Sequence, residues 1–264
     1  MLHYEASPSL ATTLVQLGLN IRSPLTNTFL YRNTLRTLQY LTITCLEISF
    51  IVNKLSQYMQ KPTEVHWTAC KRVLRYLKGT SHYGLFIRPS ANLFLYGFTD
   101  ADWASNIDDR RSTGGYCIYL GSNLVSWSSR KQHVVARSST EFEYRALAHG
   151  AAETSWLQSL LQELRVSPSS PPVLWCDNIS AGSLAANPVF HARTKHIEID
   201  VHFVHDMVLQ KSLEVRYVPS SDQIADVLTK VLPTARFLFL RDKLNVRPLP
   251  SRLRGDVRQS DNVG

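Results

Sequence analysis

Hydrophobic and polar positions from residue 91 onward predict three strands, followed by strands that alternate with helices. An apolar run with a charged end covers residues 93–104, and shorter apolar runs over 116–120 and 124–128 are joined by a Gly-Ser-Asn turn. The further expected elements are helices over 139–165, 178–186, 197–210, 220–230 and 233–244, and strands over 173–177 and 213–218. This order predicts a mixed sheet with helices on its faces.

The first 90 residues show mainly helical patterning. Apolar side chains recur at helical spacing over residues 31–58, Thr63 is expected to open another helix after Pro62, and residues 83–87 fit a short strand. The helix after Thr63 has an apolar stripe of Trp67, Cys70, Val73, Leu74 and Leu77, and its opposite side carries Lys71, Arg72, Arg75 and Lys78. A basic helix with aromatic residues fits the backbone of a nucleic-acid duplex. A helix packed on a neighbour, with a solvated basic face, fits the pattern equally well.

Charge divides the chain into three parts. Residues 1–90 carry ten Lys and Arg against three Asp and Glu, residues 91–232 carry twelve against fifteen, and residues 233–264 carry seven against three. Basic flanks around an acidic middle suit a polyanionic partner such as nucleic acid, although a solvated basic surface has the same composition. We place a domain boundary near residue 90 and expect disorder from Asn245 onward.

The composition is that of a folded protein from a reducing compartment. With 44% apolar and 19% charged residues, the 264-residue chain can bury a hydrophobic core without disulfide bonds or other cross-links. The four cysteines lie far apart and form no CxxC pair, which argues against a zinc site or a disulfide framework. No signal peptide and no bilayer-spanning run is found. We therefore expect no membrane partner and an intracellular location, cytoplasm or nucleus, rather than secretion.

Two of the expected strands end in an aspartate. Asp100 closes the first apolar run with Asp102 on the same face, and Asp177 closes the run over 173–177. Adjacent parallel strands would bring Asp100 and Asp177 together at one edge of the sheet. An Asp-rich turn explains either residue alone, whereas the repeated geometry favours a site. The role of Asp102 stays open.

Two further carboxylates can reach the same place. At about 100° per residue, Glu143 falls within the apolar stripe of the helix over 139–165, where a carboxylate needs a partner. Glu141 falls on the opposite, solvent side and suits the positive end of the helix dipole. Asp226 shares a helical face with Asp222, which lies near the expected cap and can be purely local.

Asp100, Glu143, Asp177 and Asp226 together form a candidate metal site. Four carboxylates within a few ångströms repel one another unless hard dications neutralise them, and oxygen-only ligation suits Mg²⁺ or Mn²⁺. Two such ions about 4 Å apart stabilise the attacking and leaving oxygens of an in-line phosphoryl displacement. Each carboxylate taken singly is better explained as a cap or a surface acid, so the prediction depends on their joint placement.

Several longer motifs carry a family resemblance. They are TDADWA (99–104), RRSTGGY (110–116), SWSSRKQ (126–132), SSTEFEY (138–144), CDN (176–178), RTKHI (193–197) and DQIAD (222–226). In residues 91–232 they resemble the ribonuclease H domain of copia-type LTR retrotransposon Pol polyproteins. Residues 31–88, with KRVLRYLKGT at 71–80, resemble the end of the reverse transcriptase that precedes this domain in the same family.

The resemblance implies a ribonuclease H-like mixed five-stranded sheet with flanking helices over residues 91–232. A small helical remnant of the reverse transcriptase thumb or connection would precede it over 1–90, and a helix with a disordered basic tail would follow it over 233–264. It implies a hydrolase, an endonuclease that cuts the RNA strand of RNA–DNA hybrids with two Mg²⁺ ions, or Mn²⁺. The partners implied are the hybrid and the rest of a Pol polyprotein. The candidate contacts to nucleic acid are Lys71, Arg72, Arg75, Lys78, Arg193 and Lys195.

Departures from the family pattern leave alternatives open. The polymerase palm box is absent, so no polymerase activity is expected. Arg36 stands where the family usually has Gly, and residues 45–47 replace Arg-Pro-Asp, which fits a decayed copy that binds nucleic acid without cleaving it. No histidine precedes Asp226 where many ribonucleases H have one; His191 and His196 are nearby, although capping or core roles explain them better. The order of the carboxylates (Asp, Glu, Asp, Asp) and the missing His/Cys zinc module disfavour an integrase-like nuclease. The sequence contains no Asp-Thr-Gly or Asp-Ser-Gly motif, which disfavours an aspartic protease.

Overall fold

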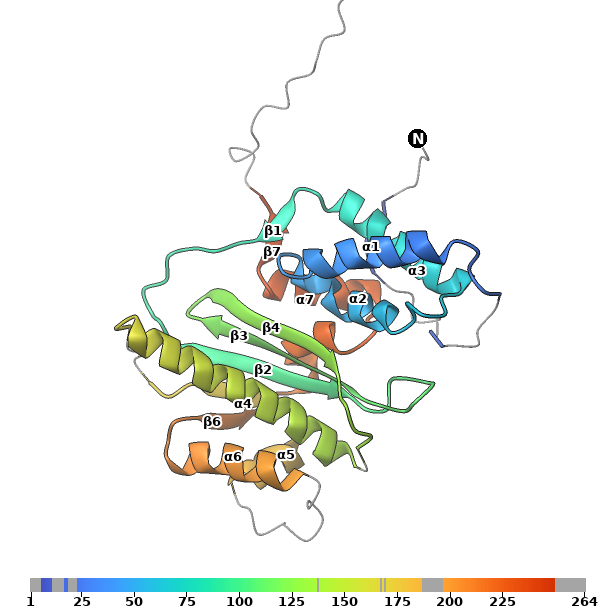
Figure 1. The fold of residues 1–264 in the computed structure, drawn as a ribbon. Helices are drawn as coiled ribbons and strands as arrows, with labels where there is room; N and C mark the ends of the chain where they lie inside the picture. The colour runs from blue at the N-terminus through green and yellow to red at the C-terminus, as the bar shows by residue number, and fades with distance from the viewer. Residues whose placement is uncertain are drawn as a thin grey trace, which may run out of the picture.

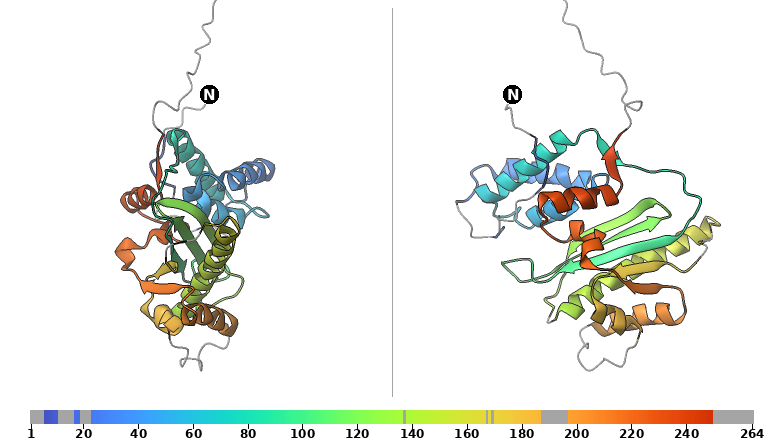
Figure 2. Two further views of the ribbon diagram at one scale, coloured as in Figure 1. Left: turned by 90° about the vertical axis from the view of Figure 1, so that its left-hand side faces the viewer. Right: turned by 180° about the vertical axis from the view of Figure 1, so that it is seen from behind.

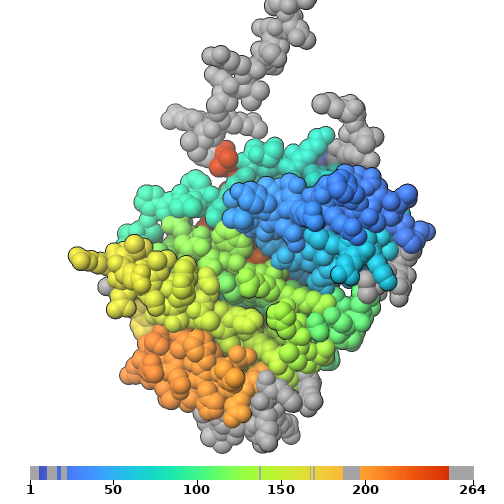
Figure 3. Space-filling model, viewed as in Figure 1, coloured from blue at the N-terminus to red at the C-terminus, as the bar shows by residue number. Residues whose placement is uncertain are grey.

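The computed structural model describes residues 6–10, 17–18, 23–136, 138–166, 168, 170–186 and 197–249. In these residues a five-stranded sheet lies between two groups of helices (Figure 1). One group comes from the N-terminal third together with the last helix, and the other follows the first three strands of the sheet. On the face seen in Figure 3, the N-terminal helices in blue adjoin the green strand residues, and the yellow-green long helix lies below them.

The sheet has the strand order β4-β3-β2-β5-β6. Its strands are β2 (Leu95–Asp102), β3 (Thr113–Leu120), β4 (Asn123–Lys131), β5 (Val173–Cys176) and β6 (Glu214–Tyr217). The first three form an antiparallel meander, and β5 and β6 extend the sheet parallel to β2. The mixed five-stranded sheet with flanking helices expected from the sequence is therefore confirmed.

Helix α4 (Ser139–Glu163) covers one face of the sheet, where it packs on β2 and β3. Ser138 caps the helix as predicted, since its hydroxyl accepts a hydrogen bond from the Glu141 amide at 3.2 Å. Helices α5 (Ile179–Ala186) and α6 (Glu198–Leu209) share a second apolar core with α4. None of the helices in the described part of the chain is long and apolar enough to cross a membrane.

The N-terminal helices and the last helix cover the opposite face of the sheet. They are α1 (Thr28–Leu41), the 3₁₀ helix η1 (Leu46–Ile48), α2 (Ser49–Ser56), α3 (Glu64–Gly79) and α7 (Thr234–Lys243). The rings of Tyr76 on α3 and Phe237 on α7 lie 5.6 Å apart, and Figure 2 shows these distant parts of the chain side by side. The same apolar core includes Tyr119 of β3, so the segments on either side of residue 90 are packed together.

Helix α3 buries most of the expected stripe, since Cys70 and Val73 are fully buried and Trp67 and Leu77 pack against the same core. Thr63 caps it as predicted, but Leu74, which the sequence places in the apolar stripe, is 40% exposed, whereas Tyr76 is fully buried. The Tyr76 hydroxyl donates a hydrogen bond to Glu47 at 3.2 Å. Because a buried phenol needs such a partner, the unrecognised contact with Glu47 accounts for the difference.

The segment that follows β6 is not the single helix expected over 220–230. It consists of two 3₁₀ helices, η4 (Ser220–Asp222) and η5 (Ile224–Leu228). The buried Gln223 separates them, and its side-chain oxygen accepts a hydrogen bond from the Ala225 amide at 3.2 Å. A side chain that bonds to nearby backbone competes with a continuous helix.

The C-terminal segment also differs from expectation where it is described. Instead of disorder directly after Asn245, the chain forms β7 (Val246–Pro248), which pairs antiparallel with β1 (Tyr83–Leu85). The short strand expected over 83–87 is thereby confirmed. The expected tail from residue 250 onward lies outside the described residues.

The close packing of α4 on β2 depends on Gly150. A Cβ atom at this position would lie 2.6 Å from Cγ2 of Thr99, which precedes Asp100 in the sheet. Protein interiors are packed closely enough that such an overlap forces the backbone to move. Gly150 therefore sets how near the N-terminal half of α4 comes to the end of β2.

We expect Gly150→Ala to lower the free energy of unfolding by about 1–3 kcal/mol, because the added methyl must separate α4 from β2. Gly182→Ala in α5 is the matched control, since its Cβ would meet no atom of the described residues within 4 Å and helix propensity predicts about 0.5–1 kcal/mol of stabilisation. Urea denaturation of both variants measures the difference. Equal stabilities would contradict the close approach.

Candidate active site

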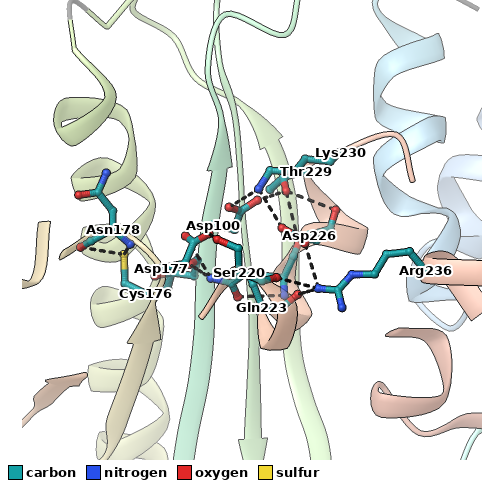
Figure 4. Close-up of polar contacts among 12 residues, drawn as sticks. Asp100, Cys176, Asp177, Asn178, Ser220, Gln223, Asp226, Thr229, Lys230 and Arg236 are labelled. Atoms are coloured by element: carbon teal, nitrogen blue, oxygen red, sulfur yellow. Dashed lines mark hydrogen bonds and ion pairs between the residues drawn. The ribbon is translucent and has the colours of Figure 1, made fainter. Parts of the chain in front are cut away.

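Two strand ends bring the first pair of predicted carboxylates together. Thr99 of β2 pairs in parallel with Cys176 of β5, so the next residues, Asp100 and Asp177, lie side by side at the carboxyl edge of the sheet (Figure 4). The Asp100 side chain is completely buried. This placement is the one predicted from the repeated strand-end pattern.

Glu143 reaches the same edge from the second turn of α4. It is 7% exposed, and its Oε2 atom is buried without a hydrogen-bond partner in the described part of the protein. Ligand atoms of Glu143, Cys176 and Asp177 all lie within 4.8 Å of one another. A buried, unpartnered carboxylate oxygen is costly unless a cation or a proton satisfies it.

Asp226 completes the cluster from η5, and it brings a cation with it. The Lys230 ammonium lies 2.8 Å from Oδ1 of Asp226 and 2.9 Å from Oδ1 of Asp100. The Thr229 hydroxyl donates a hydrogen bond to the other Asp100 oxygen. Figure 4 shows Lys230 and Thr229 converging on Asp100 from the segment that carries Asp226.

Hydrogen bonds from the segment after β6 hold Asp177 in place. The Ser220 hydroxyl donates to Oδ2 of Asp177 at 3.0 Å, and the Gln223 amide lies 3.5 Å from Oδ1. The same amide donates to the Thr99 carbonyl at 2.9 Å. Gln223 therefore fixes the distance between the ends of β2 and β5.

Arg236 on α7 clamps the loop that presents Asp226. Its guanidinium lies 3.2 Å from Oδ2 of Asp226 and donates to the carbonyl oxygens of Ser220 and Gln223 at 3.0 and 3.2 Å. These contacts tie η4, η5 and α7 together. The position of Asp226 thus depends on a helix that lies beyond the predicted ribonuclease H segment.

Crowding and burial shift the protonation of the cluster. Burial raises the pKa of Asp100 to about 6; the positive charge of Lys230 lowers this pKa, and the negative charge of Asp226 raises it further. Burial, together with the charges of Asp100 and Asp177, raises the pKa of Glu143 to about 9. The pKa of Lys230 is held above its usual range, because the two aspartates outweigh its burial. Without an added cation, Glu143 therefore holds a proton at neutral pH.

The donor set fits a hard dication. Oxygen atoms come from four carboxylates, and within the described ranges Oε2 of Glu143 has no other partner. Cys176 is an unsuitable ligand for such an ion, because burial raises the pKa of its thiol to about 12. Its Sγ atom also accepts a hydrogen bond from the Asn178 amide at 3.4 Å. The ligand atoms that the cluster offers to a divalent ion are therefore carboxylate oxygens.

The predicted contrast between Glu141 and Glu143 is only half correct. Glu141 is 8% exposed, almost as buried as Glu143, and not on a solvent side. Its carboxylate forms an ion pair with Arg145, one turn later, at 2.8 Å. What separates the two glutamates is the partner: an arginine for Glu141 and the carboxylate cluster for Glu143.

The other candidate residues have different surroundings. Asp102, the last residue of β2, is half-buried, and burial raises its pKa while Lys230 and Lys54 lower it. Asp222 is exposed in η4, which agrees with a local role. Arg72 donates to the carbonyl and hydroxyl oxygens of Ser9, both at 3.0 Å, so its guanidinium ties the N-terminal segment to α3. Outside the described residues lie Arg193, Lys195, His191 and His196.

Sequence reasoning missed Lys230, Arg236, Gln223 and Cys176 as neighbours of the cluster. A spacing of four residues links Lys230 to Asp226, and it is the one signal that could have drawn attention to a cation there. Arg236 carries no such signal, because its contacts with the η4–η5 segment depend on how α7 docks.

Comparison with known proteins gives sequence relatives but no match to a protein-family model. The chain is 48% identical over 228 residues to the retrovirus-related Pol polyprotein from transposon RE2 of Arabidopsis thaliana, and 47% identical over 235 residues to that from transposon RE1. The Pol polyprotein from transposon TNT 1-94 of Nicotiana tabacum is 38% identical over 213 residues. These alignments cover 80–89% of the chain, which spans 16% of the length of each relative.

Solved structures with some likeness to the chain include a ribonuclease H1 and a viral enzyme. LC11-RNase H1 in complex with an RNA/DNA hybrid gives a TM-score of 0.40 at 14% identity, over 51% of this chain and 93% of that one. The foamy viral protease-reverse transcriptase in complex with an RNA/DNA hybrid gives 0.44 at 15% identity, over 81% and 27%. From its sequence relatives, the chain belongs to the family of retrovirus-related Pol polyproteins of copia-type transposons.

Proposed function

We propose that this chain is a ribonuclease H, a divalent-metal-dependent endonuclease that cuts the RNA strand of RNA–DNA hybrids. The observation that carries the proposal is the convergence of Asp100, Glu143, Asp177 and Asp226 at one edge of the sheet, with Oε2 of Glu143 buried and without a hydrogen-bond partner among the residues that the structure describes. Membership of the Pol family supports it, because the motifs in residues 91–232 resemble the ribonuclease H domain of copia-type Pol polyproteins.

Asp100, Glu143, Asp177 and Asp226 would hold two Mg²⁺ ions, or Mn²⁺, through carboxylate oxygens. When bound, the ions supply an activated water and neutralise the charge that develops on the leaving 3′-oxygen. The protein supplies orientation: Ser220 and Gln223 fix Asp177, and Arg236 fixes Asp226. Glu143 gives up its proton as positive charge enters the cluster.

Recognition of the hybrid would depend on its shape and its 2′-hydroxyls more than on its sequence. On α3, Lys71, Arg72, Arg75 and Lys78 are the candidates for contact with the duplex backbone, and Arg72 would have to give up its hydrogen bonds to Ser9 to make such a contact. The rest of a Pol polyprotein is the proposed partner in the chain's full context. The alternative is a remnant of the Pol polyprotein that binds nucleic acid but does not cleave it. A cleavage assay distinguishes the two proposals.

We expect the protein to cleave the RNA strand of an end-labelled RNA–DNA hybrid only when Mg²⁺ or Mn²⁺ is present. Asp177→Asn should lower the cleavage rate about a hundredfold or more, because one oxygen ligand loses its charge. Asp206→Asn, at an exposed position of α6, is the matched control and should leave the rate unchanged. Gel electrophoresis of the labelled strand measures both.

Three results would contradict parts of this proposal. Cleavage in EDTA would exclude metal dependence, and unchanged activity of Asp177→Asn would exclude the assigned site. Hybrid binding by the wild-type protein without cleavage at any Mg²⁺ or Mn²⁺ concentration would favour the non-catalytic remnant.

The protonation of Glu143 predicts how stability depends on pH. Its folded-state pKa of about 9 lies above its usual 4.5, so its stabilising contribution is complete below about pH 4.5 and is lost as pH rises toward 9. The ion-free wild type should therefore lose stability relative to Glu143→Gln between pH 6 and 9, while the stabilisation by Mg²⁺ grows. Thermal melts in EDTA and in Mg²⁺ measure both trends.

Glu163→Gln, at an exposed position near the end of α4, is the control for this experiment. It should follow the wild type at every pH. Parallel melting temperatures of the wild type and Glu143→Gln across the whole range would show that Glu143 does not titrate within the cluster.

A further inference from the structure

Positive charge is distributed unevenly over the four carboxylates. Lys230 pairs with both Asp100 and Asp226, and Arg236 pairs with Asp226 as well. Among the described residues, no ion pair joins a cation to Glu143 or Asp177. The cluster thus has a neutralised half, Asp100 with Asp226, and a half to which no described side-chain cation is paired, Glu143 with Asp177, which we call the cation-free half.

The ammonium of Lys230 is held in this position by its surroundings. Lys230 follows Thr229, which is fully buried and donates its own hydrogen bond to Asp100. Phe50, Ile51 and Val227 line the same small pocket as Lys230, which fits an apolar stem under a charged head. One third of the Lys230 side chain is nevertheless exposed. The Lys230 side chain thus has solvent on one side, toward which the ammonium would turn on leaving the carboxylates.

We propose that Lys230 is a resident counter-cation that sets the order in which the cluster takes up divalent ions. The cation-free half, Glu143 with Asp177, accepts an ion while Lys230 stays in place. The neutralised half, Asp100 with Asp226, accepts an ion only when the ammonium is displaced. This inference rests on the proposed function, because it requires the cluster to be a site for divalent ions.

The physical reason is competition between positive charges for the same oxygen atoms. An ammonium 2.8–2.9 Å from Asp100 and Asp226 occupies the lone pairs that an ion would use. A dication placed beside it is also repelled, and this repulsion is strong where burial lowers the effective dielectric. The second ion must therefore bind more weakly than the first by the cost of removing Lys230.

Isothermal titration of the substrate-free protein with Mn²⁺ tests the proposal without reference to activity. The wild type should bind one ion more tightly and a second more weakly. Lys230→Met should tighten the weaker step about tenfold or more, because the competing charge is gone. Lys230→Arg, which keeps a cation, and Lys211→Met, which removes an exposed lysine, should both titrate like the wild type.

The neutral variant also leaves Asp100 buried without its cation. Lys230→Met should therefore melt at a lower temperature than the wild type in EDTA, and Mn²⁺ should restore it. If the variant does not fold in EDTA, NMR of lysine side-chain Cε groups in the wild type, titrated with diamagnetic Mg²⁺ in place of paramagnetic Mn²⁺, gives the same information. The Lys230 signal, assigned by its loss in Lys230→Arg, should stay unchanged during the first step and shift during the second.

The outcomes separate failure of this inference from failure of the proposed site. If the wild type binds Mn²⁺ and Asp177→Asn abolishes the tighter step, but Lys230→Met leaves the weaker step unchanged or weakens it, the competition is wrong and the site stands. A Lys230 signal that shifts with the first ion also overturns the order. If Mn²⁺ binding is absent, or is the same in Asp177→Asn, both the inference and the proposed site fail.

Discussion

Mutual repulsion among the carboxylates at one edge of the sheet is the constraint on which the rest of this structure depends. Asp100 is completely buried, and Glu143 and Asp226 are nearly so. Full ionisation of such a cluster without compensation is unfavourable. The ion-free protein compensates in two ways: Lys230 and Arg236 neutralise Asp100 and Asp226, and Glu143 holds a proton.

This compensation draws on segments far apart in the chain. Lys230 follows η5, Arg236 lies on α7, and the apolar core that holds both segments includes the N-terminal helices. The helical segment before residue 90 therefore supports the loop that carries Asp226. A division of the chain at residue 232 remains a prediction, but it would separate Arg236 from the carboxylate that it clamps.

The sequence predicts the sheet and three strand- or helix-borne carboxylates well, because each follows from a local period. Asp100 and Asp177 end apolar strands, and Glu143 falls within an apolar helical stripe. The spacing of apolar residues does not predict the structure where a polar side-chain contact determines it. Glu141 is buried through Arg145, and the expected last helix is interrupted because Gln223 bonds to nearby backbone.

The cations of the site could not be predicted by the same reasoning. A lysine four residues after an aspartate is common on exposed helices, and the sequence does not show that both Lys230 and Asp226 turn inward. Arg236 reaches Asp226 only because α7 docks beside η5. These contacts are tertiary, and they determine which carboxylates are free to bind an ion.

Anomalous diffraction from crystals of the wild-type protein grown with Mn²⁺ tests the central claim most directly. The account predicts an anomalous peak in contact with carboxylate oxygens of Glu143 and Asp177, and Lys230 turned away from Asp100 wherever a second peak lies between Asp100 and Asp226. Crystals saturated with Mn²⁺ that show no peak within the carboxylate cluster, with Lys230 still bonded to Asp100 and Asp226, would contradict it.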